Sequence, residues 1–421
     1  MRILKMIFAL CLGSLAACTA HAGAPQTPPP QPTLYANGWT FLLVPSLEGQ
    51  KNGNGLDVNG LNQSLRLGQL LNTLSAGLQS SLRQVYAVST DKTDMRPLES
   101  VQPFALLNNL PLNVQGLDPS SYNNPAWFID NLMGYQQPGI YVIGAAPELM
   151  PALIAALGAP AITAPTDTPY YVVASGAALP LRASAYATGL IPDTRYPDIA
   201  LPPLLPSCGA QTKFSVPAPQ GLKAYANQSV YFVRHVEAHP TANFENGNYV
   251  CQGQWRALGS TEILLRKMGG QRPDYVFTSS PNAPIGGCDQ PCSYVRPTLT
   301  VAPFATRNDM ALSLASFPWS GYQDLATSLF DASSPLFPHT KDGARILVGW
   351  EHGNIEKAVK YLVGTVYQNP AKAKDIPAWN YQDYDTIWKL ETDVRGNLTF
   401  SNDCEQIPTP ALPSTCPAFF Q

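Results

Sequence analysis

The stretch VYFVRHVE, residues 230–237, has the pattern of a buried strand that ends at Arg234 and His235. Its first four residues are all apolar, which is typical of a strand covered on both faces within a parallel sheet. The stretch FLLVPSLE, residues 41–48, has the same form, but proline and serine stand where the second stretch has arginine and histidine. The chain therefore holds two strands of one kind, and only the second ends in side chains suited to chemistry.

The likeness between the two halves continues along the chain in the same order. RPLESVQPFA, residues 96–105, and RPTLTVAPFA, residues 296–305, coincide at six of ten positions. Further on, YVIGAAPELMPALIAALG, residues 141–158, corresponds to ILVGWEHGNIEKAVKYLVG, residues 346–364. Because the matches are collinear, they favour two copies of one ancestral unit over chance similarity.

Each half alternates apolar strands with helical stretches. In the second half we expect a helix over Gln254–Lys267, a strand over Tyr275–Thr278 and a helix that opens at Arg296 with proline at an early position. The strand Ile346–Gly349 precedes a helix whose apolar positions recur at helical spacing: Ile355, Ala358, Val359 and Leu362. Strands alternating with helices predict an α/β layer structure with mostly parallel sheets.

The predicted organisation has six parts: a signal or lipobox region over 1–22, a Pro-rich tether over 23–34, a first domain over 35–190, a Pro-rich linker over 191–222, a second domain over 223–403 and a tail over 404–421. The boundaries follow shifts in composition, above all runs of proline. Proline makes up 41 of the 421 residues.

The start of the chain predicts export. Arg2 and Lys5 precede the apolar run Ile7–Leu15, which is too short for a membrane-spanning helix. Leu15-Ala16-Ala17-Cys18 resembles a bacterial lipobox, with Cys18 as the lipid anchor, while Ala20-His21-Ala22 fits simple cleavage. We favour the lipobox and expect a periplasmic or outer-membrane lipoprotein, with a secreted protein as the alternative.

Composition excludes some classes of partner. The formal net charge is −3 and charged residues make up only 13% of the chain, so no basic face for nucleic acid is expected. An apolar content of 45% argues against global disorder. We expect a soluble, folded, exported protein of more than one domain.

Six cysteines follow Cys18, and nearly all lie in the second half: Cys208, Cys251, Cys288, Cys292, Cys404 and Cys416. An even number in an exported chain predicts disulfides, although six cysteines allow fifteen pairings. We expect bridges in the 288–292 loop and the 404–416 tail. Zinc is the weaker alternative, because a single Cys-x3-Cys pair has no second pair or histidine nearby.

Four residues of the second half are candidates for chemistry. Functional side chains in open α/β sheets gather at the carboxyl ends of the strands. Arg234 and His235 follow the first strand, Arg296 follows the loop after the second, and His352 follows the strand at 346–349. Two histidines and two arginines suit a phosphoryl group: an imidazole can attack phosphorus while guanidiniums grip its oxygens.

These residues resemble the histidine phosphatase superfamily, which has the phosphoglycerate-mutase-like fold. The resemblance covers roughly Tyr225–Ser401, and its motifs are Arg234-His235-Val236-Glu237, Ser279-Ser280-Pro281 with Arg296, and Trp350-Glu351-His352-Gly353. Val236 departs from the glycine of the family's Arg-His-Gly tripeptide.

The resemblance implies two tandem phosphoglycerate-mutase-like, three-layer α/β/α domains with mostly parallel sheets. It makes His235 the nucleophile and places Arg234, Arg296 and His352 in the phosphate pocket, with no metal or other cofactor. The first copy lacks both histidines and is expected to be inactive and to pack against the second.

The general acid is left open between two carboxylates. Glu351 directly precedes His352 and is the nearest in sequence to the pocket, and Asp309 is the alternative. Glu351 can equally serve to orient an arginine or histidine. His239 and His339 do not match the family's motifs.

Two functions compete at this stage. The first is an exported phosphatase that hydrolyses small phosphate monoesters through a phosphohistidine at His235. The second is a non-catalytic binding or scaffolding lipoprotein of the cell envelope that keeps the phosphatase fold. The complete His and Arg set favours the first.

Overall fold

The structure is a computed structural model, and it describes residues 32–35, 37–165, 168–188, 199, 201–238, 246–288, 292–333, 336–337 and 343–417. Residues 1–31, including Cys18 and the alternative cleavage site, lie outside this part, as do His239 and His339. Thr33–Gln421 forms one compact unit. Within the described residues, no helix has the length and apolar character needed to cross a membrane.

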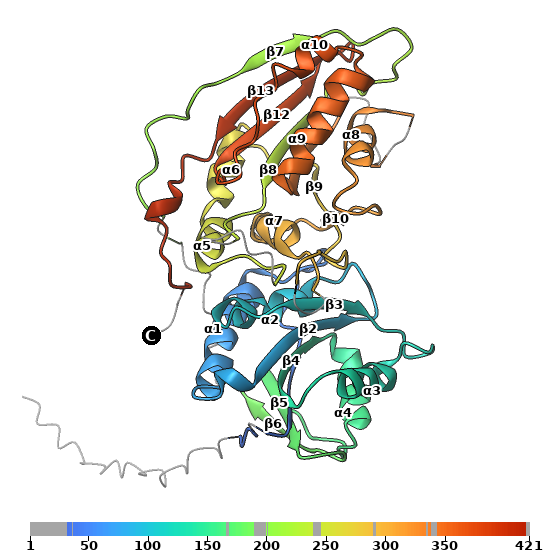
Figure 1. Ribbon diagram of the computed structural model, residues 1–421, viewed down its shortest axis with the longest axis vertical. Coiled ribbons are helices and arrows are strands. Elements are labelled where there is room, and N and C mark those ends of the chain that lie inside the picture. Colours follow the sequence, from blue (N-terminus) through green and yellow to red (C-terminus); the bar gives the residue numbers. More distant parts are fainter. Residues whose placement is uncertain are drawn as a thin grey trace, which may run out of the picture. The chain divides into compact units, whose positions relative to one another are not determined.

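The first half of the unit is built on a six-stranded sheet with the order β3-β2-β4-β1-β5-β6 (Figure 1). Its strands are β1 (Trp39–Pro45), β2 (Leu82–Ser89), β3 (Leu112–Gly116), β4 (Gly139–Ala145), β5 (Tyr170–Gly176) and β6 (Arg182–Ala187). Its helices are α1 (Val58–Leu74), α2 (Arg96–Leu107), α3 (Pro125–Tyr135) and α4 (Met150–Ala156), with short 3-10 turns at Gln79–Ser81 and Pro147–Leu149. The first four strands of that order are parallel, and β5 and β6 are antiparallel.

The second half is built on a seven-stranded sheet with the order β10-β9-β11-β8-β12-β13-β7. Its strands are β7 (Lys213–Val216), β8 (Ser229–Arg234), β9 (Tyr275–Thr278), β10 (Leu312–Leu314), β11 (Arg345–Trp350), β12 (Thr386–Thr392) and β13 (Leu398–Cys404). Its helices are α5 (Cys251–Gly259), α6 (Thr261–Lys267), α7 (Arg296–Arg307), α8 (Tyr322–Phe330), α9 (His352–Tyr361) and α10 (Pro370–Ala373), with a π-helical turn at Leu362–Val366 and a 3-10 turn at Thr409–Ala411.

The two sheets share one topology. The parallel strands β3-β2-β4-β1 have the same order and direction as β10-β9-β11-β8, and an antiparallel pair, β5-β6 or β12-β13, extends each sheet at the same edge. The predicted α/β class with parallel strands is therefore what the chain adopts. The antiparallel pairs, and β7 beyond β13, were not expected from the sequence.

Helices cover both faces of each sheet, which makes three layers. In β8, Tyr231 and Val233 belong to the hydrophobic cluster on the α5–α7 side, whereas Val230 and Phe232 belong to the cluster on the α8–α9 side. Because successive side chains of a strand point to opposite faces, the two clusters lie on opposite faces of the sheet. In the first sheet, alternate side chains of β1 likewise belong to the hydrophobic cluster on the α1–α2 side and to the cluster on the α3–α4 side.

A glycine marks the same close contact in both halves. A Cβ atom at Gly349 in β11 would lie 2.6 Å from Cγ1 of Val301 in α7, and one at Gly144 in β4 would lie 2.9 Å from Cγ1 of Val101 in α2. No real Cβ tolerates such distances, so the helix approaches the sheet only because these strand positions lack a side chain.

The helical layers α1–α2 and α5–α7 share one hydrophobic cluster, to which both sheets contribute. Hydrogen bonds cross between the same two layers and their loops: Gln50 Nε2 donates to Thr306 Oγ1 at 3.1 Å, and Val114 N donates to Ser293 Oγ at 3.0 Å.

The structure corrects three local expectations. The stretch predicted as one helix over 254–267 consists of α5 and α6, which are separated at Ser260. The Pro-rich linker over 191–222 contains β7, which pairs with β13. Of the expected bridges, Cys288–Cys292 forms within its loop, but the two tail cysteines pair with distant partners, as Cys208–Cys404 and Cys251–Cys416.

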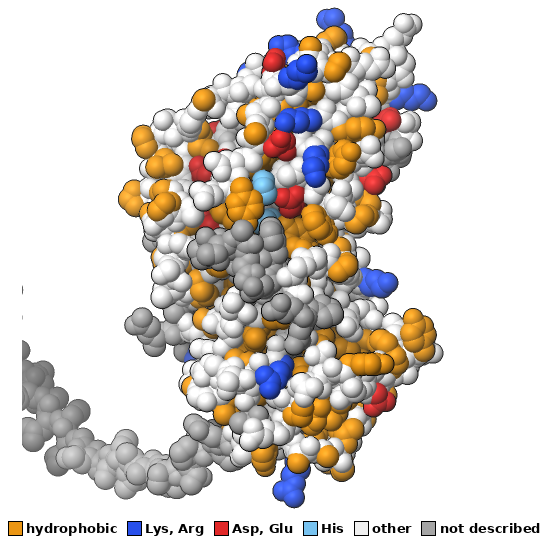
Figure 2. All heavy atoms as spheres, viewed as in Figure 1, with side chains coloured by type: hydrophobic (Ala, Val, Ile, Leu, Met, Phe, Trp, Pro, Cys, Tyr) orange, Lys and Arg blue, Asp and Glu red, His pale blue; other side chains and the backbone are white. Residues whose placement is uncertain are grey.

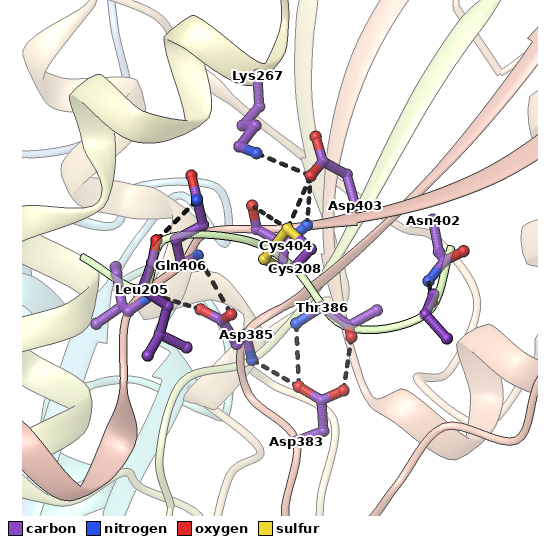
Figure 3. Close-up of a disulfide and its surroundings, with 12 residues drawn as sticks. Leu205, Cys208, Lys267, Asp383, Asp385, Thr386, Asn402, Asp403, Cys404 and Gln406 are labelled. Carbon is purple, nitrogen blue, oxygen red and sulfur yellow. Dashed lines mark hydrogen bonds and ion pairs between the residues drawn. A yellow bond between two sulfur atoms is a disulfide. The ribbon is translucent and has the colours of Figure 1, made fainter. Parts of the chain in front are cut away.

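The Cys208–Cys404 bridge joins the segment before β7 to the end of β13 (Figure 3). Lys267 lies beside it, with its Nζ 2.8 Å from Asp403 Oδ1. The two sulfur atoms and Asp403 lie close enough together to suggest a metal site, but both cysteines are disulfide-bonded and are not thiolate ligands.

Candidate active site

His235 is the first residue after β8, at the carboxyl end of the parallel strands. Its backbone N–H donates to Trp350 O at 2.9 Å, which extends the pairing of β8 with β11 by one residue. Its side chain is only 2% exposed. The neighbouring strand thus fixes the backbone of this buried histidine.

The imidazole of His235 is held in one tautomer. Its Nδ1 lies 2.9 Å from Val236 O, a carbonyl that can only accept, so Nδ1 carries the proton and Nε2 keeps a lone pair. Burial, together with the nearby charges of Arg234 and Arg296, lowers the pKa of His235 well below that of a free imidazole. The ring is therefore neutral at physiological pH, with a nucleophilic nitrogen.

Arg234 ends β8 and is held by the loop before β12. Its Nη1 donates to Tyr381 O and, at 3.2 Å, to Asp383 O. Its Cζ lies 4.0 Å from the centroid of the Tyr384 ring, a cation–π contact. Its Nε is buried and has no hydrogen-bond partner among the described residues. A donor in this position fits an anionic ligand.

Arg296 is the first residue of α7, and Pro297 follows it at an early position where a helix tolerates proline. Its side chain is buried, and Nε donates to Asn248 O at 2.6 Å. Burial lowers the pKa of Arg296, but an arginine in a protein stays charged. The positive end of the α7 dipole lies at the same place as this charge.

His352 is the first residue of α9, and Glu351 is the N-cap of that helix. The Glu351 carboxylate accepts from Gly353 N at 2.8 Å and from Asn354 N at 2.7 Å. Its Oε1 also lies 2.7 Å from His352 Nδ1, an ion-pair contact outside the angles of a good hydrogen bond. Burial raises the pKa of Glu351, but His352 and the two backbone N–H groups outweigh burial and hold it below its usual range.

Three tyrosine rings connect the four predicted side chains. The ring centroid of Tyr384 lies 6.1 Å from that of His235, and the same tyrosine ring contacts Arg234. Tyr294 lies 6.0 Å from the His235 ring and 5.6 Å from Arg296 Cζ. Tyr381 lies 5.6 Å from the His352 ring and 5.4 Å from Arg234 Cζ. The structure therefore brings Arg234, His235, Arg296 and His352 together around these rings.

The structure does not bring Asp309 to this cluster. Asp309 follows the carboxyl end of α7 in a left-handed turn, with φ of 52°, whereas Arg296 begins the same helix. Twelve helical residues separate the two ends by about 18 Å. The contacts of Glu351 favour the orienting role over the acid role, because an ionised carboxylate has no proton to donate.

Glu237, two residues after His235, belongs to a buried charge network that the sequence gave no reason to single out. Arg256 of α5 is fully buried and lies 2.7 Å from Glu237 Oε1, 3.0 Å from Glu405 Oε2 and 3.3 Å from Asp385 Oδ1. Its Nη2 also donates to Ile407 O at 3.0 Å. One guanidinium thus ties the loop after β8 to the start of β12 and to the segment after β13.

The equivalent place in the first sheet lacks these side chains. Ser46 N donates to Ala145 O at 2.8 Å, the same bond that His235 makes with Trp350 in the second sheet. Arg96, which begins α2, is neutralised by Asp94 through contacts of 2.7 Å and 2.9 Å. This place therefore has no imidazole, and its arginine is engaged by a carboxylate.

Part of the site reaches the surface. In Figure 2, a histidine side chain is visible among hydrophobic and acidic side chains of the second half. His352 and Glu351 each keep 16% of their side-chain surface exposed, whereas His235 and both arginines are buried beneath. His352 and Glu351 are therefore more accessible to a ligand than His235 and the two arginines.

No family model and no curated protein matches the chain. Among solved structures, a protein described as the phosphohistidine phosphatase SixA from Agrobacterium tumefaciens matches with 15% identity and a TM-score of 0.25, over 39% of this chain and 92% of that chain. A phosphoglycerate mutase from Plasmodium falciparum matches with 13% identity and a TM-score of 0.27, over 46% of this chain and 99% of that chain. A SixA protein from Nakamurella multipartita matches with 13% identity and a TM-score of 0.24, over 40% of this chain and 86% of that chain. These TM-scores lie below 0.5, so the function proposed next rests on the residues of this chain.

Proposed function

We propose that the protein is a phosphatase that hydrolyses phosphate monoesters through a phosphohistidine at His235. The observation that carries the proposal is the fixed tautomer of His235. Its Nδ1–H donates to Val236 O, so Nε2 keeps its lone pair, and the buried charges of Arg234 and Arg296 are close enough to act on the ring.

The reaction proceeds in two displacements at phosphorus. His235 Nε2 forms a bond to phosphorus as the bond from phosphorus to the ester oxygen breaks, and the ester oxygen takes a proton from solvent water and leaves as the alcohol. Water then attacks the phosphohistidine and gives up a proton to solvent, the P–N bond breaks, and inorganic phosphate is released. Arg234, Arg296 and the amino ends of α7 and α9 supply positive charge to the phosphoryl oxygens in both steps.

His352 donates a hydrogen bond to the phosphoryl group, and Glu351 orients it. This role follows from the N-cap contacts of Glu351, which hold the carboxylate at the start of α9. Arginines and helix ends provide the charge that a metal ion supplies in other phosphatases, so we propose a metal-independent reaction.

We propose that the chain is a tandem of two such units, with 35–190 the inactive copy and 223–403 the active one. The shared strand order and the equivalent bonds of Ser46 and His235 support this proposal. We also propose export, either as a lipoprotein anchored at Cys18 or as a secreted protein. Three disulfides support it, because such bonds persist in oxidising compartments.

The test is a panel of phosphate esters assayed with wild type and His235→Ala, alongside trapping of an acid-labile phosphoenzyme. We expect hydrolysis and a phosphoenzyme in the wild type and neither in the variant. Because His235 is buried, His235→Asn serves as a second variant, and thermal unfolding shows whether each is folded. Activity of a folded His235 variant at the wild-type rate contradicts the proposal. No hydrolysis of any ester by the wild type favours the alternative, a binding protein of the cell envelope.

A further inference from the structure

A cavity adjoins the candidate phosphate site. Its volume is about 570 Å³, within the range of small-molecule pockets. One wall is the loop 381–385 before β12, and the other is the segment 407–410 after β13. The two walls come from different parts of the chain, and neither belongs to the parallel strands that carry the nucleophile.

The cavity and the phosphate site share residues. Tyr381 and Tyr384 line the cavity, and their rings contact Arg234, at 5.4 Å and 4.0 Å from its Cζ. Tyr381 also contacts the His352 ring, and Tyr384 the His235 ring. A phosphoryl group held by these arginines and histidines would therefore carry the rest of its ester into or beside this cavity.

The lining favours a flat, uncharged group. It holds two tyrosine rings and the apolar side chains of Leu205, Ile407, Pro408 and Pro410, and no lysine or arginine is among its described residues. Tyr381 is 41% exposed, so part of its ring is open to a ligand. Aromatic groups stack on such rings, whereas a second phosphate has no cation here to bind.

The two carboxylates of the lining are already engaged. Asp383 accepts from Asp385 N at 2.8 Å and Thr386 N at 3.1 Å, and Asp385 accepts from Ile407 N at 2.7 Å. Asp385 also lies 3.3 Å from Arg256 Nη1. Asp385 therefore joins the two walls, while Asp383 holds its own loop, and their negative charge further disfavours an anionic group in the cavity.

Arg256 fixes both walls relative to the nucleophile. It contacts Asp385 of the first wall, Ile407 O of the second, and Glu237 of the loop that contains His235. The cavity is thus built in advance of ligand binding, which lowers the entropic cost of holding a substrate.

We propose that this cavity binds the leaving group, and that the preferred substrates are monoesters of aromatic, uncharged alcohols. The proposal rests on the phosphatase function proposed above and adds the substrate class. Tyr381 is its specificity-determining residue, and esters with a second phosphate are poor substrates.

The test compares benzyl phosphate with n-propyl phosphate, which are both esters of primary alcohols, so the comparison isolates the aromatic ring. We expect wild-type kcat/KM to favour benzyl phosphate by about tenfold or more, as an aromatic contact of ordinary strength provides. In Tyr381→Ala this ratio falls about tenfold, while Tyr381→Phe keeps it. Tyr135→Ala, at an exposed tyrosine of α3, is the matched control and leaves the ratio unchanged.

A binding measurement separates failure of the subsite from failure of the function. Benzylphosphonate and propylphosphonate, which cannot be hydrolysed, are titrated into wild type and Tyr381→Ala by calorimetry. Tighter binding of the benzyl compound that depends on Tyr381 supports the cavity even if neither ester is hydrolysed. Equal binding of the two phosphonates, or a benzyl preference that survives in Tyr381→Ala, overturns the inference, even where His235-dependent hydrolysis stands.

Discussion

Glu351 Oε1 lies 2.7 Å from His352 Nδ1, and the same carboxylate caps the helix that His352 begins. One side chain therefore sets both the start of α9 and the position of the histidine. Substitutions at this residue test the helix and the site together.

Replacing Glu351 with glutamine keeps a hydrogen-bond acceptor but removes the charge. We expect Glu351→Gln to lose about 1 kcal/mol of unfolding free energy at pH 7, as for loss of a helix cap. The pKa of Glu351 is lowered in the fold, so its charge stabilises the protein above its unfolded pKa, and that contribution disappears as pH falls through the folded pKa. Urea unfolding of wild type and Glu351→Gln at pH 7 and near pH 3 measures this contribution. If the variant loses the same unfolding free energy at both pH values, the prediction is contradicted.

The pH dependence of the reaction reports on His235. Burial and two arginines lower the pKa of this imidazole, and protonation of Nε2 removes the nucleophile. We therefore expect the acidic limb of kcat/KM to have its midpoint well below 6.5, the pKa of a free histidine. Rates for a monoester with a neutral leaving group, measured from pH 4 to 9, check this. A midpoint above 6.5 means that the nucleophile is charged in the free enzyme.

Glu405 makes the buried network around Arg256 sensitive to pH. Burial raises the pKa of Glu405 to about 7, although Arg256 lowers it in part. A carboxyl with a raised folded pKa stabilises the protein least at high pH, because the unfolded chain releases its proton from about pH 4.5 upwards. We expect the unfolding free energy of Glu405→Gln, taken relative to that of wild type, to increase by about 1–3 kcal/mol from pH 5 to pH 8. Unfolding of both proteins at the two values measures this, with Glu391→Gln, on an exposed ion pair, as control.

The close approach of α7 to β11 depends on Gly349. A methyl group here would meet Val301 Cγ1 at 2.6 Å and Pro297 O at 3.0 Å. We expect Gly349→Ala to lower the unfolding free energy by about 1–3 kcal/mol. We also expect it to lower activity, because α7 carries Arg296 at its start. Gly134→Ala, in α3 with no atom near its added Cβ, is the control and is expected to be neutral or slightly stabilising. Equal melting temperatures for the two variants would falsify this account of the interface.

The predicted site residues share a property that made them visible in the sequence. Arg234 ends a buried apolar strand and His235 follows it directly, His352 lies two residues after another such strand, and Arg296 opens a helix with a proline behind it. Local pattern alone places such residues at strand and helix ends. The two halves reinforce the pattern, because the six strands of the first sheet have counterparts, in the same order, in the second.

The remaining parts of the site depend on pairings between distant residues, which no local pattern reveals. Tyr381 and Tyr384 reach Arg234 only because β12 pairs antiparallel with β8, some 150 residues earlier, with Ile387 opposite Val233. Arg256 contacts Glu405 across 149 positions. The sequence did not predict a strand after residue 385. The position of the preceding loop, 381–385, next to Arg234 could therefore not be predicted either. The sequence signal available was the Tyr-Gln-Asp-Tyr run at 381–384, which is rich in groups that bind ligands.

The bonds of Arg256 and the two long-range disulfides also govern when the site comes into being. A ribosome makes the nucleophile loop and Arg256 long before Glu405, Ile407 and Cys416, yet these later residues complete the cavity wall and the bridges. The parallel strands can assemble while the wall is still missing. A chain that stops before residue 405 lacks these contacts, so the cavity wall and the Cys251–Cys416 bridge require synthesis through residue 416.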